Sequence, residues 1–444
     1  MTRRKMQAAS SVSPGRLIRT RLHHVYKAIN TVRSNDRSRA DPTESALAGS
    51  RRKASALERR AIPHKRRLLG GILLATVASA ACTSGGSASP EHEDQAPAQS
   101  TAAESTEQAL KKFIEDSWPR GAGGTVVAAR GSDLLICTGL GMADRKAQVP
   151  ADCDTVYDLM SMTKQFTAAG ILKLEMMGML QVSDSISKFL GPVPDEKSSI
   201  TLHHLLTHTA GLTDGLGGDY EALSRKEILD AALRSELQSR PGSEYFYSNL
   251  GYSVLAAIIE KVSGMGYEEF LAENLFAPAG MTQTGYVLPD WDLEQVAVEY
   301  DKDGKTMGRP FDHPWADDGP YWNLRGNGGM LSTARDMFRW HVALESDAVL
   351  DRSVKDKLFK PYVLEEDGGD THYGYGWVVL STLEGRAVWH NGGNGWSYGE
   401  IARFPGGVMV FWVSNRAYKA KDWNMERLDG NLTLGIAERA RDPG

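Results

Sequence analysis

Strand-like segments at both ends of the folded region, with helix-like segments between them, restrict the possible folds more than any other feature of the sequence. Three pairs of short apolar segments are separated by turn residues: 124–130 with 134–139, 375–380 with 386–389, and 398–404 with 408–413. Short apolar runs joined by Gly-, Ser-, Asp- or Pro-Gly-containing turns are typical of β-hairpins. The sequence therefore predicts antiparallel strands contributed by both ends of this region.

The middle of the chain has the apolar spacing of helices. We expect helices over residues 164–177, 250–262 and 333–344, the last opened by Thr333 and Asp336 at the spacing of a capping box. The economical architecture is an α/β (α+β) fold, in which an antiparallel β-sheet is flanked by helices and carries an inserted, mostly helical lobe. Clefts form naturally between two such lobes.

The first part of the chain differs in composition from the rest. Residues 1–64 are rich in Lys and Arg and lack sustained apolar periodicity, which predicts a basic, disordered extension. Residues 65–81 combine a Lys-Arg-Arg start, a short apolar run and small residues. This is the pattern of a signal peptide, because the apolar run is too short to span a bilayer.

Cys82 directly follows the small residues, as in the bacterial lipobox, whose cysteine becomes lipidated. Residues 82–106 are rich in Ser, Gly, Ala, Glu and Gln and predict a flexible linker. The folded domain is then expected over residues 107–440. We expect an exported protein at the extracytoplasmic face of the bacterial cell membrane, with a lipid anchor at Cys82.

The remaining cysteines are Cys137 and Cys153. In an exported protein such a pair can form a disulfide, and two buried free thiols are the alternative. The formal net charge of −5 gives no reason to expect nucleic acid as a partner. We expect a small-molecule or peptide substrate, with the membrane contacted through the lipid anchor.

Ser161 and Lys164 are the first candidates for catalysis. Residues three apart share a helix face, so the ammonium group of Lys164 can approach the hydroxyl group of Ser161. A serine hydroxyl is a poor nucleophile until a neighbouring base accepts its proton. The pattern is weak by itself, since a serine near a helix start can also be purely structural.

A Tyr-x-Asn triplet, Tyr247 to Asn249, precedes the second predicted helix. A tyrosine has an ordinary pKa near 10 and becomes a useful base only beside a cation, a role that Lys164 can fill. The amide of Asn249 offers both a donor and an acceptor to a substrate or to the lysine.

A third segment, Trp389-His390-Asn391-Gly392-Gly393, ends a predicted strand. Glycines let the backbone approach a bound carbonyl group closely. The backbone N–H groups of Ser161 and Gly393 could therefore form an oxyanion hole.

Together and in this order, the three segments resemble the serine β-lactamase and penicillin-binding protein superfamily. The similarity is greatest to its class C β-lactamase-like branch, which includes D-alanyl-D-alanine carboxypeptidases, D-amino-acid peptidases and esterases. Residues 201–212 and 328–336 match further segments of that branch, and the resemblance covers about residues 107–440. It implies a β-lactamase/transpeptidase-like fold.

The resemblance also implies roles for individual residues. It makes Ser161 the acylated nucleophile, with acid–base work shared by Lys164 and Tyr247. Substrate binding falls to Asn249, His390 and Gly392.

His390 departs from the family pattern, because most β-lactamases have a lysine there, in a Lys-Thr-Gly motif. A histidine is mostly neutral above its ordinary pKa of roughly 6.5. We therefore expect a serine hydrolase acting on an ester, a D-amino-acid amide or a β-lactam, in that order of preference.

Two other interpretations remain. His204 and His208 have the spacing of metal ligands on a helix, but Leu205 stands where a zinc protease has Glu, and no third ligand is evident. No metal or cofactor is therefore expected. The alternative to an enzyme is an inactive lipoprotein that binds cell-wall peptides or a protein.

Overall fold

The computed structural model describes residues 99–416, 419–420 and 423–441. The predicted basic extension 1–64, the signal peptide 65–81 and Cys82 lie outside the described residues. Helix α2, Gln99–Ser117, begins within the predicted linker 82–106, so the last residues of that segment are helical. Ala, Glu and Gln, which suggested a linker, are also good helix formers.

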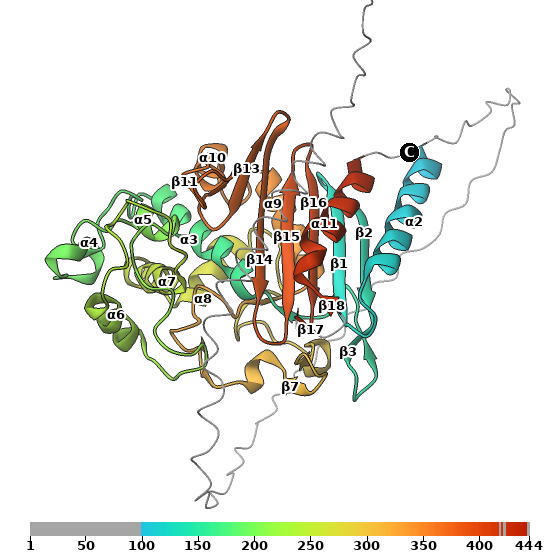
Figure 1. Ribbon diagram of the computed structural model, residues 1–444, viewed down its shortest axis with the longest axis horizontal. Coiled ribbons are helices and arrows are strands. Elements are labelled where there is room, and N and C mark those ends of the chain that lie inside the picture. Colours follow the sequence, from blue (N-terminus) through green and yellow to red (C-terminus); the bar gives the residue numbers. More distant parts are fainter. Residues whose placement is uncertain (1–98, 417–418, 421–422, 442–444) are drawn as a thin grey trace, which may run out of the picture. The chain divides into compact units, whose positions relative to one another are not determined.

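Eight strands of the described residues form one antiparallel sheet in the order β11-β12-β13-β14-β15-β16-β1-β2. Their bounds are β1 Gly124–Arg130, β2 Asp133–Leu140, β11 Val363–Leu364, β12 Thr371–Tyr373, β13 Val378–Thr382, β14 Gly385–Gly393, β15 Tyr398–Phe404 and β16 Val408–Ser414. The first strand pairs with the last, from Gly124 opposite Ser414 to Arg130 opposite Val408. Figure 1 shows β1 beside β16, so both ends of the domain build one sheet and the predicted fold class is confirmed.

Alternate residues of the strands face two separate cores. Val126 packs with the aromatic and aliphatic side chains of α2 and of α11, Glu426–Arg441, on one face of the sheet. Val127 packs on the other face with α3, Lys164–Met176, and α9, Ala334–Glu345. This alternation follows from the two-residue period of a strand. The sheet is therefore the middle layer, and the helical lobe joins it on the α3 side.

Helix α3 is buried along most of its length, and Phe166 fixes it in the core. The ring of Phe166 makes edge-to-face contacts with Phe276 and Trp340, at centroid distances of 5.1 and 5.2 Å. Edge-to-face pairs add about 1 kcal/mol beyond the burial of apolar surface. The first residues of α3 are thus held in place by the core beneath them.

Two other predicted helices are present with small changes. Helix α7 spans Asn249–Ser263. Thr333 caps α9 by accepting a hydrogen bond from the backbone N–H of Asp336. The predicted capping box is only half formed, since the Asp336 carboxylate instead accepts hydrogen bonds from the Gln283 backbone N–H and the Thr284 hydroxyl.

The remaining elements are short and lie mostly in the inserted lobe or at its borders. The helices are α4 Ser187–Leu190, α5 Leu202–Leu206, α6 Arg225–Arg234, α8 Tyr267–Leu271 and α10 Arg352–Leu358. The strand pairs are β3 Met142–Asp144 with β4 Val149–Pro150, β5 Tyr157–Asp158 with β10 Leu331–Ser332, β6 Glu299–Tyr300 with β7 Thr306–Gly308, β8 Trp315–Ala316 with β9 Gly319–Pro320, and β17 Lys419–Ala420 with β18 Trp423–Asn424.

A disulfide joins Cys137 on β2 to Cys153 in the loop before β5. It ties the edge of the sheet to the segment that leads into Ser161. Among the described helices, none has the length and apolar character needed to cross a bilayer.

Candidate active site

Ser161 lies in a short 3-10 helix, Met160–Thr163, which runs directly into α3. Residues three apart are eclipsed in a 3-10 helix, which brings the side chains of Ser161 and Lys164 onto one side. Met160 has a φ of 50°, in the left-handed region that a non-glycine residue rarely adopts. Its backbone N–H donates to Asp158 at 2.6 Å. Asp158 therefore stabilises the sharp turn that presents Ser161.

Lys164 is fully buried and connects three parts of the site. Its Nζ donates to Ser161 Oγ at 3.2 Å, to Asn249 Oδ1 at 2.6 Å and to the Asn327 backbone carbonyl at 2.8 Å. The three acceptors come from the 3-10 helix, the start of α7 and the loop before β10. Three acceptors match the three donors of an ammonium group, so the position of Nζ beside Ser161 is fixed.

Asn249 and Tyr247 approach the same lysine from the start of α7. The Asn249 side-chain NH2 donates to Asp214 at 3.0 Å, which leaves its oxygen directed at Lys164. The Lys164 ammonium lies 4.9 Å from the centre of the Tyr247 ring, within the range of a cation–π contact. The Tyr-x-Asn triplet and the Ser-x-x-Lys pattern therefore meet at Lys164.

The end of β14 packs closely against the 3-10 helix. A Cβ atom on Gly392 would lie 2.8 Å from the Leu159 carbonyl oxygen and from the Ser161 backbone nitrogen. Only glycine allows this approach. Gly393, the next residue, lines the same small cavity as Ser161.

This cavity has a volume of about 60 Å³ and includes the residues closest to the proposed chemistry. Its lining combines acidic, polar and apolar residues with glycines: Asp158, Met160, Ser161, Asp219, Tyr220, Asn249, Leu324, Asn327, Gly328, Gly393 and Asn394. Ser161, Asn249 and Gly393 are thus brought together as the sequence suggests. Asp158, Asp219 and Asn327 were not predicted.

His390 and Gly392 do not line this cavity. His390 is buried, its Nε2 shares a hydrogen bond with the Tyr373 hydroxyl at 3.0 Å, and its Nδ1 lies 2.6 Å from the Asn391 carbonyl oxygen. It shares a face of β14 with Gly392, two residues away. The structure thus places the histidine beside a buried tyrosine.

The acidic groups of the site have raised pKa values. Burial, followed by the nearby carboxylate of Glu299, raises the pKa of Asp158 well above its usual range. Partial desolvation raises the pKa of Asp219, which Asp214 raises further and Lys164 lowers. Burial, followed by the carboxylates of Asp158, Glu299 and Asp219, raises the pKa of Tyr220. The groups around the cavity therefore disfavour further negative charge.

The two histidines at metal-ligand spacing have other partners. His204 Nδ1 accepts a hydrogen bond from the Thr201 backbone N–H in the capping box of α5. His208 Nδ1 accepts from the Ser248 backbone N–H at 3.0 Å and so supports the turn that carries Tyr247. The part of the chain that the structure describes contains no group of three or more potential metal-ligating side chains.

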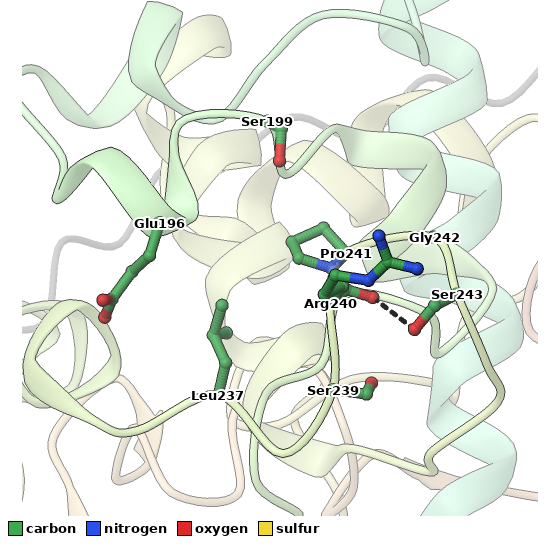
Figure 2. Close-up of a pocket in the computed structure, with 8 residues that line it drawn as sticks. All are labelled: Glu196, Ser199, Leu237, Ser239, Arg240, Pro241, Gly242 and Ser243. Carbon is green, nitrogen blue, oxygen red and sulfur yellow. Dashed lines mark hydrogen bonds between the residues drawn. The ribbon is translucent and has the colours of Figure 1, made fainter.

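A larger, open hollow of about 790 Å³ occurs elsewhere on the helical lobe. Figure 2 shows Glu196 and Arg240 at its sides, with the Ser243 hydroxyl donating to the Arg240 carbonyl oxygen at 2.8 Å. None of the candidate catalytic residues lines it. Size alone therefore does not identify the reactive site.

Comparison with known proteins gives a consistent result. A family model described as Beta-lactamase matches residues 108–433. Over 285 residues the chain is 33% identical to penicillin-binding protein 4* of Bacillus subtilis (strain 168), which corresponds to 61% of this chain and 62% of that protein. The chain thus spans less than two thirds of the length of this curated relative.

Two solved structures show the same fold. The octameric penicillin-binding protein homologue from Pyrococcus abyssi matches with a TM-score of 0.61 and 26% identity, over 75% of this chain and 77% of that chain. A beta-lactamase/D-alanine carboxypeptidase from Yersinia pestis complexed with citrate matches with a TM-score of 0.62 and 23% identity, over 76% and 99%. Because its identity is only 23%, the similarity to the second structure shows a shared fold and nothing more.

Proposed function

The chain belongs to the beta-lactamase family, and from this premise we propose that it is a serine hydrolase that forms an acyl-enzyme at Ser161. One observation carries the proposal: the Lys164 ammonium is 3.2 Å from Ser161 Oγ and is held there by Asn249 and by the Asn327 carbonyl. A purely structural serine has no need of a buried lysine at this distance.

In the proposed first step, Ser161 Oγ attacks the substrate carbonyl carbon while its proton passes to the Tyr247 oxygen, which acts as the base beside the Lys164 ammonium. The backbone N–H groups of Ser161 and Gly393 stabilise the negative oxygen that develops. Tyr247 then protonates the leaving group, and the bond between the carbonyl carbon and that group breaks. Water adds to the acyl-enzyme and releases the acid, which restores Ser161.

The proposed substrates are an ester, a D-amino-acid amide or peptide, and a β-lactam, in decreasing order of preference. The observation behind this order concerns His390. A lysine at this position would present a permanent cation to a substrate carboxylate, whereas His390 is buried and bonded to Tyr373. We propose that hydrolysis of carboxylate-bearing β-lactams is the weakest of the three activities.

A substrate panel tests the proposal directly. We expect hydrolysis of p-nitrophenyl esters, lower rates with D-Ala-D-Ala peptides and the lowest rates with nitrocefin. The Ser161→Ala variant should lose about a thousandfold or more in kcat/KM on every substrate that the wild type cleaves.

Labelling with a fluorophosphonate separates an enzyme from an inactive binding protein. The phosphorus–oxygen bond forms at Ser161 Oγ as fluoride leaves, so intact mass should rise by the mass of one phosphonyl group. Absence of this adduct on wild-type protein, under conditions that label a control hydrolase, would contradict the proposal. Ser161→Ala should remain unlabelled.

A further inference from the structure

The cavity beside Ser161 has acidic side chains in its lining and close to it. Asp158 and Asp219 both line it, and Asp214 lies behind Asn249. Asp219 is exposed to solvent at the cavity, forms no hydrogen bond or ion pair with any described residue, and lies within electrostatic reach of Lys164. Lys164 already satisfies Ser161, Asn249 and Asn327, so its three donors are used.

A further carboxylate, that of Glu299, lies within electrostatic reach of Asp158. Glu299 is buried, and its charge contributes to the raised pKa of Asp158. Ser397 donates to one Glu299 oxygen at 2.7 Å. The other oxygen accepts no hydrogen bond from the described residues, and His313 Nε2 lies 3.4 Å from it.

Aromatic rings lie beside these carboxylates. Tyr220, which lines the cavity, stacks on His313 at a centroid distance of 4.4 Å, and His313 stacks on Trp396 at 5.0 Å. The faces of tyrosine and tryptophan rings attract cations. Carboxylates and aromatic faces together are the chemistry that proteins use to recognise an ammonium group.

Lys164 offsets part of the negative charge around the cavity, but its three N–H donors bind Ser161, Asn249 and Asn327. Desolvation raises the pKa of Asp158, Asp219 and Tyr220, and neighbouring carboxylates raise each pKa further. A positive charge placed between them would relieve this repulsion. A substrate carboxylate in the same place would increase it.

We propose that this cavity binds the protonated α-amine of an aminoacyl substrate, with Asp219 as its principal counter-charge and Asp158 and the Tyr220 ring completing the subsite. The α-position is part of the proposal and is suggested by the shared lining, because Ser161 and Asp219 both border one small cavity of about 60 Å³. An ammonium group in so small a space lies close to the carbonyl that Ser161 attacks. The substrate class is therefore an amino-acid amide or ester with a free amino group, which rests on the proposed function.

The inference is tested by binding rather than turnover. The full-length Ser161→Ala variant is titrated calorimetrically with D-alanyl p-nitroanilide, its N-acetyl derivative and its N-succinyl derivative at pH 7. These probes place a cation, a neutral amide or an added carboxylate at the same nitrogen. We expect the free amine to bind at least about tenfold more tightly than the N-acetyl probe, and the N-succinyl probe to bind most weakly.

Asp219→Asn is then added to the Ser161→Ala background. It should remove most of the preference for the free amine, while the N-acetyl probe provides the internal reference. Asp290→Asn is the matched control, because Asp290 is exposed and does not line the cavity. That control removes the same charge from the molecule and should leave the preference intact.

Equal or tighter binding of either acylated probe would overturn the inference. So would a complete lack of binding by the free amine, or a preference that survives Asp219→Asn. The proposed function fails separately, when wild-type Ser161 takes up no fluorophosphonate. If the protein bound the free amine selectively but took up no fluorophosphonate, the amine subsite would stand and the proposed reactive serine would not.

Discussion

Lys164 illustrates how much of the proposed chemistry depends on one buried side chain. The Lys164→Met substitution keeps a side chain of similar length but removes every donor to Ser161, Asn249 and Asn327. We expect kcat/KM for p-nitrophenyl acetate to fall at least about a hundredfold, because the cation that holds Ser161 and supports Tyr247 as the base is lost. Steady-state kinetics measure the loss, and circular dichroism checks the fold.

The control for this change lies on the same helix. Lys173 on α3 donates to the Val349 carbonyl and contacts no candidate catalytic residue. Lys173→Met therefore loses a comparable hydrogen bond and should keep near-normal activity. Similar losses in both variants would mean that α3 packing, rather than the Lys164 ammonium, determines the rate.

His341 predicts a pH dependence of stability that does not involve the active site. Its Nδ1 accepts from Arg403 Nε, its Nε2 lies 3.1 Å from the Gly131 carbonyl oxygen, and burial with the Arg403 charge lowers its pKa to about 3. The unfolded chain takes up this proton near pH 6.5, whereas the folded chain takes it up only near pH 3. Stability is therefore lost as the pH falls between these values, by up to about 1.4 kcal/mol per pH unit.

Urea unfolding at pH 7.5 and pH 5 measures this effect. Wild type should lose about 2 kcal/mol more between the two pH values than His341→Gln, which carries no group that titrates there. The comparison between proteins cancels the contributions of the other acids and histidines. Equal losses in the two proteins would rule out His341 as the source.

At the scale of elements, the contact between β14 and the 3-10 helix makes a prediction of its own. Gly392→Ala places a methyl group 2.8 Å from the Leu159 carbonyl and the Ser161 nitrogen. The strand or the helix must move, which alters the proposed oxyanion hole. We expect at least about a tenfold loss of kcat with the fold retained, because small misplacements of reacting groups are costly.

Gly395→Ala is the matched control, since a Cβ atom there meets no other atom within 4 Å. Gly395 lies just beyond the end of β14, and the variant should keep full activity in the same kinetic assay. If Gly392→Ala were equally active, close contact at this glycine would have no bearing on catalysis.

Elements were easier to predict than the site around Ser161. The bounds of β1 and β15 match the predicted segments because each strand ends at Gly or Pro turn residues, and β1 also has a clear apolar run. That Lys164 and Asn249 lie in one site was predicted only because the order of the three motifs resembles that of a known superfamily. Asp219, in contrast, lies in a loop without regular structure, so no periodicity indicates that it lines the cavity beside Ser161.

The same limit applies to side-chain partners. His390 was placed at a strand end from the sequence, but its bond to Tyr373 depends on the register between strands that lie apart in the chain. Asn327 contributes a backbone carbonyl, which any residue type could supply. Such contacts leave no signature in the identity of the residue.

At the scale of the whole molecule, the disulfide and the first part of the chain point to the same compartment. Disulfides such as Cys137–Cys153 persist mainly in oxidising surroundings outside the cytoplasm. The charged, apolar and small residues of 65–81 have the order of an export signal. We propose that the protein is exported and that Cys82 carries a lipid.

This proposal predicts where the protein is found in a bacterial host. Wild type should sediment with membranes, and mass spectrometry should find Cys82 at the amino terminus with acyl chains attached, since two or more chains hold a protein stably at a bilayer. Cys82→Ser cannot be acylated through sulfur and should leave the membrane fraction. Ser84→Ala, two residues further along, keeps the cysteine and should stay with the membrane. Wild type that remains soluble with an unmodified Cys82 thiol would contradict the anchor, whatever the activity of Ser161.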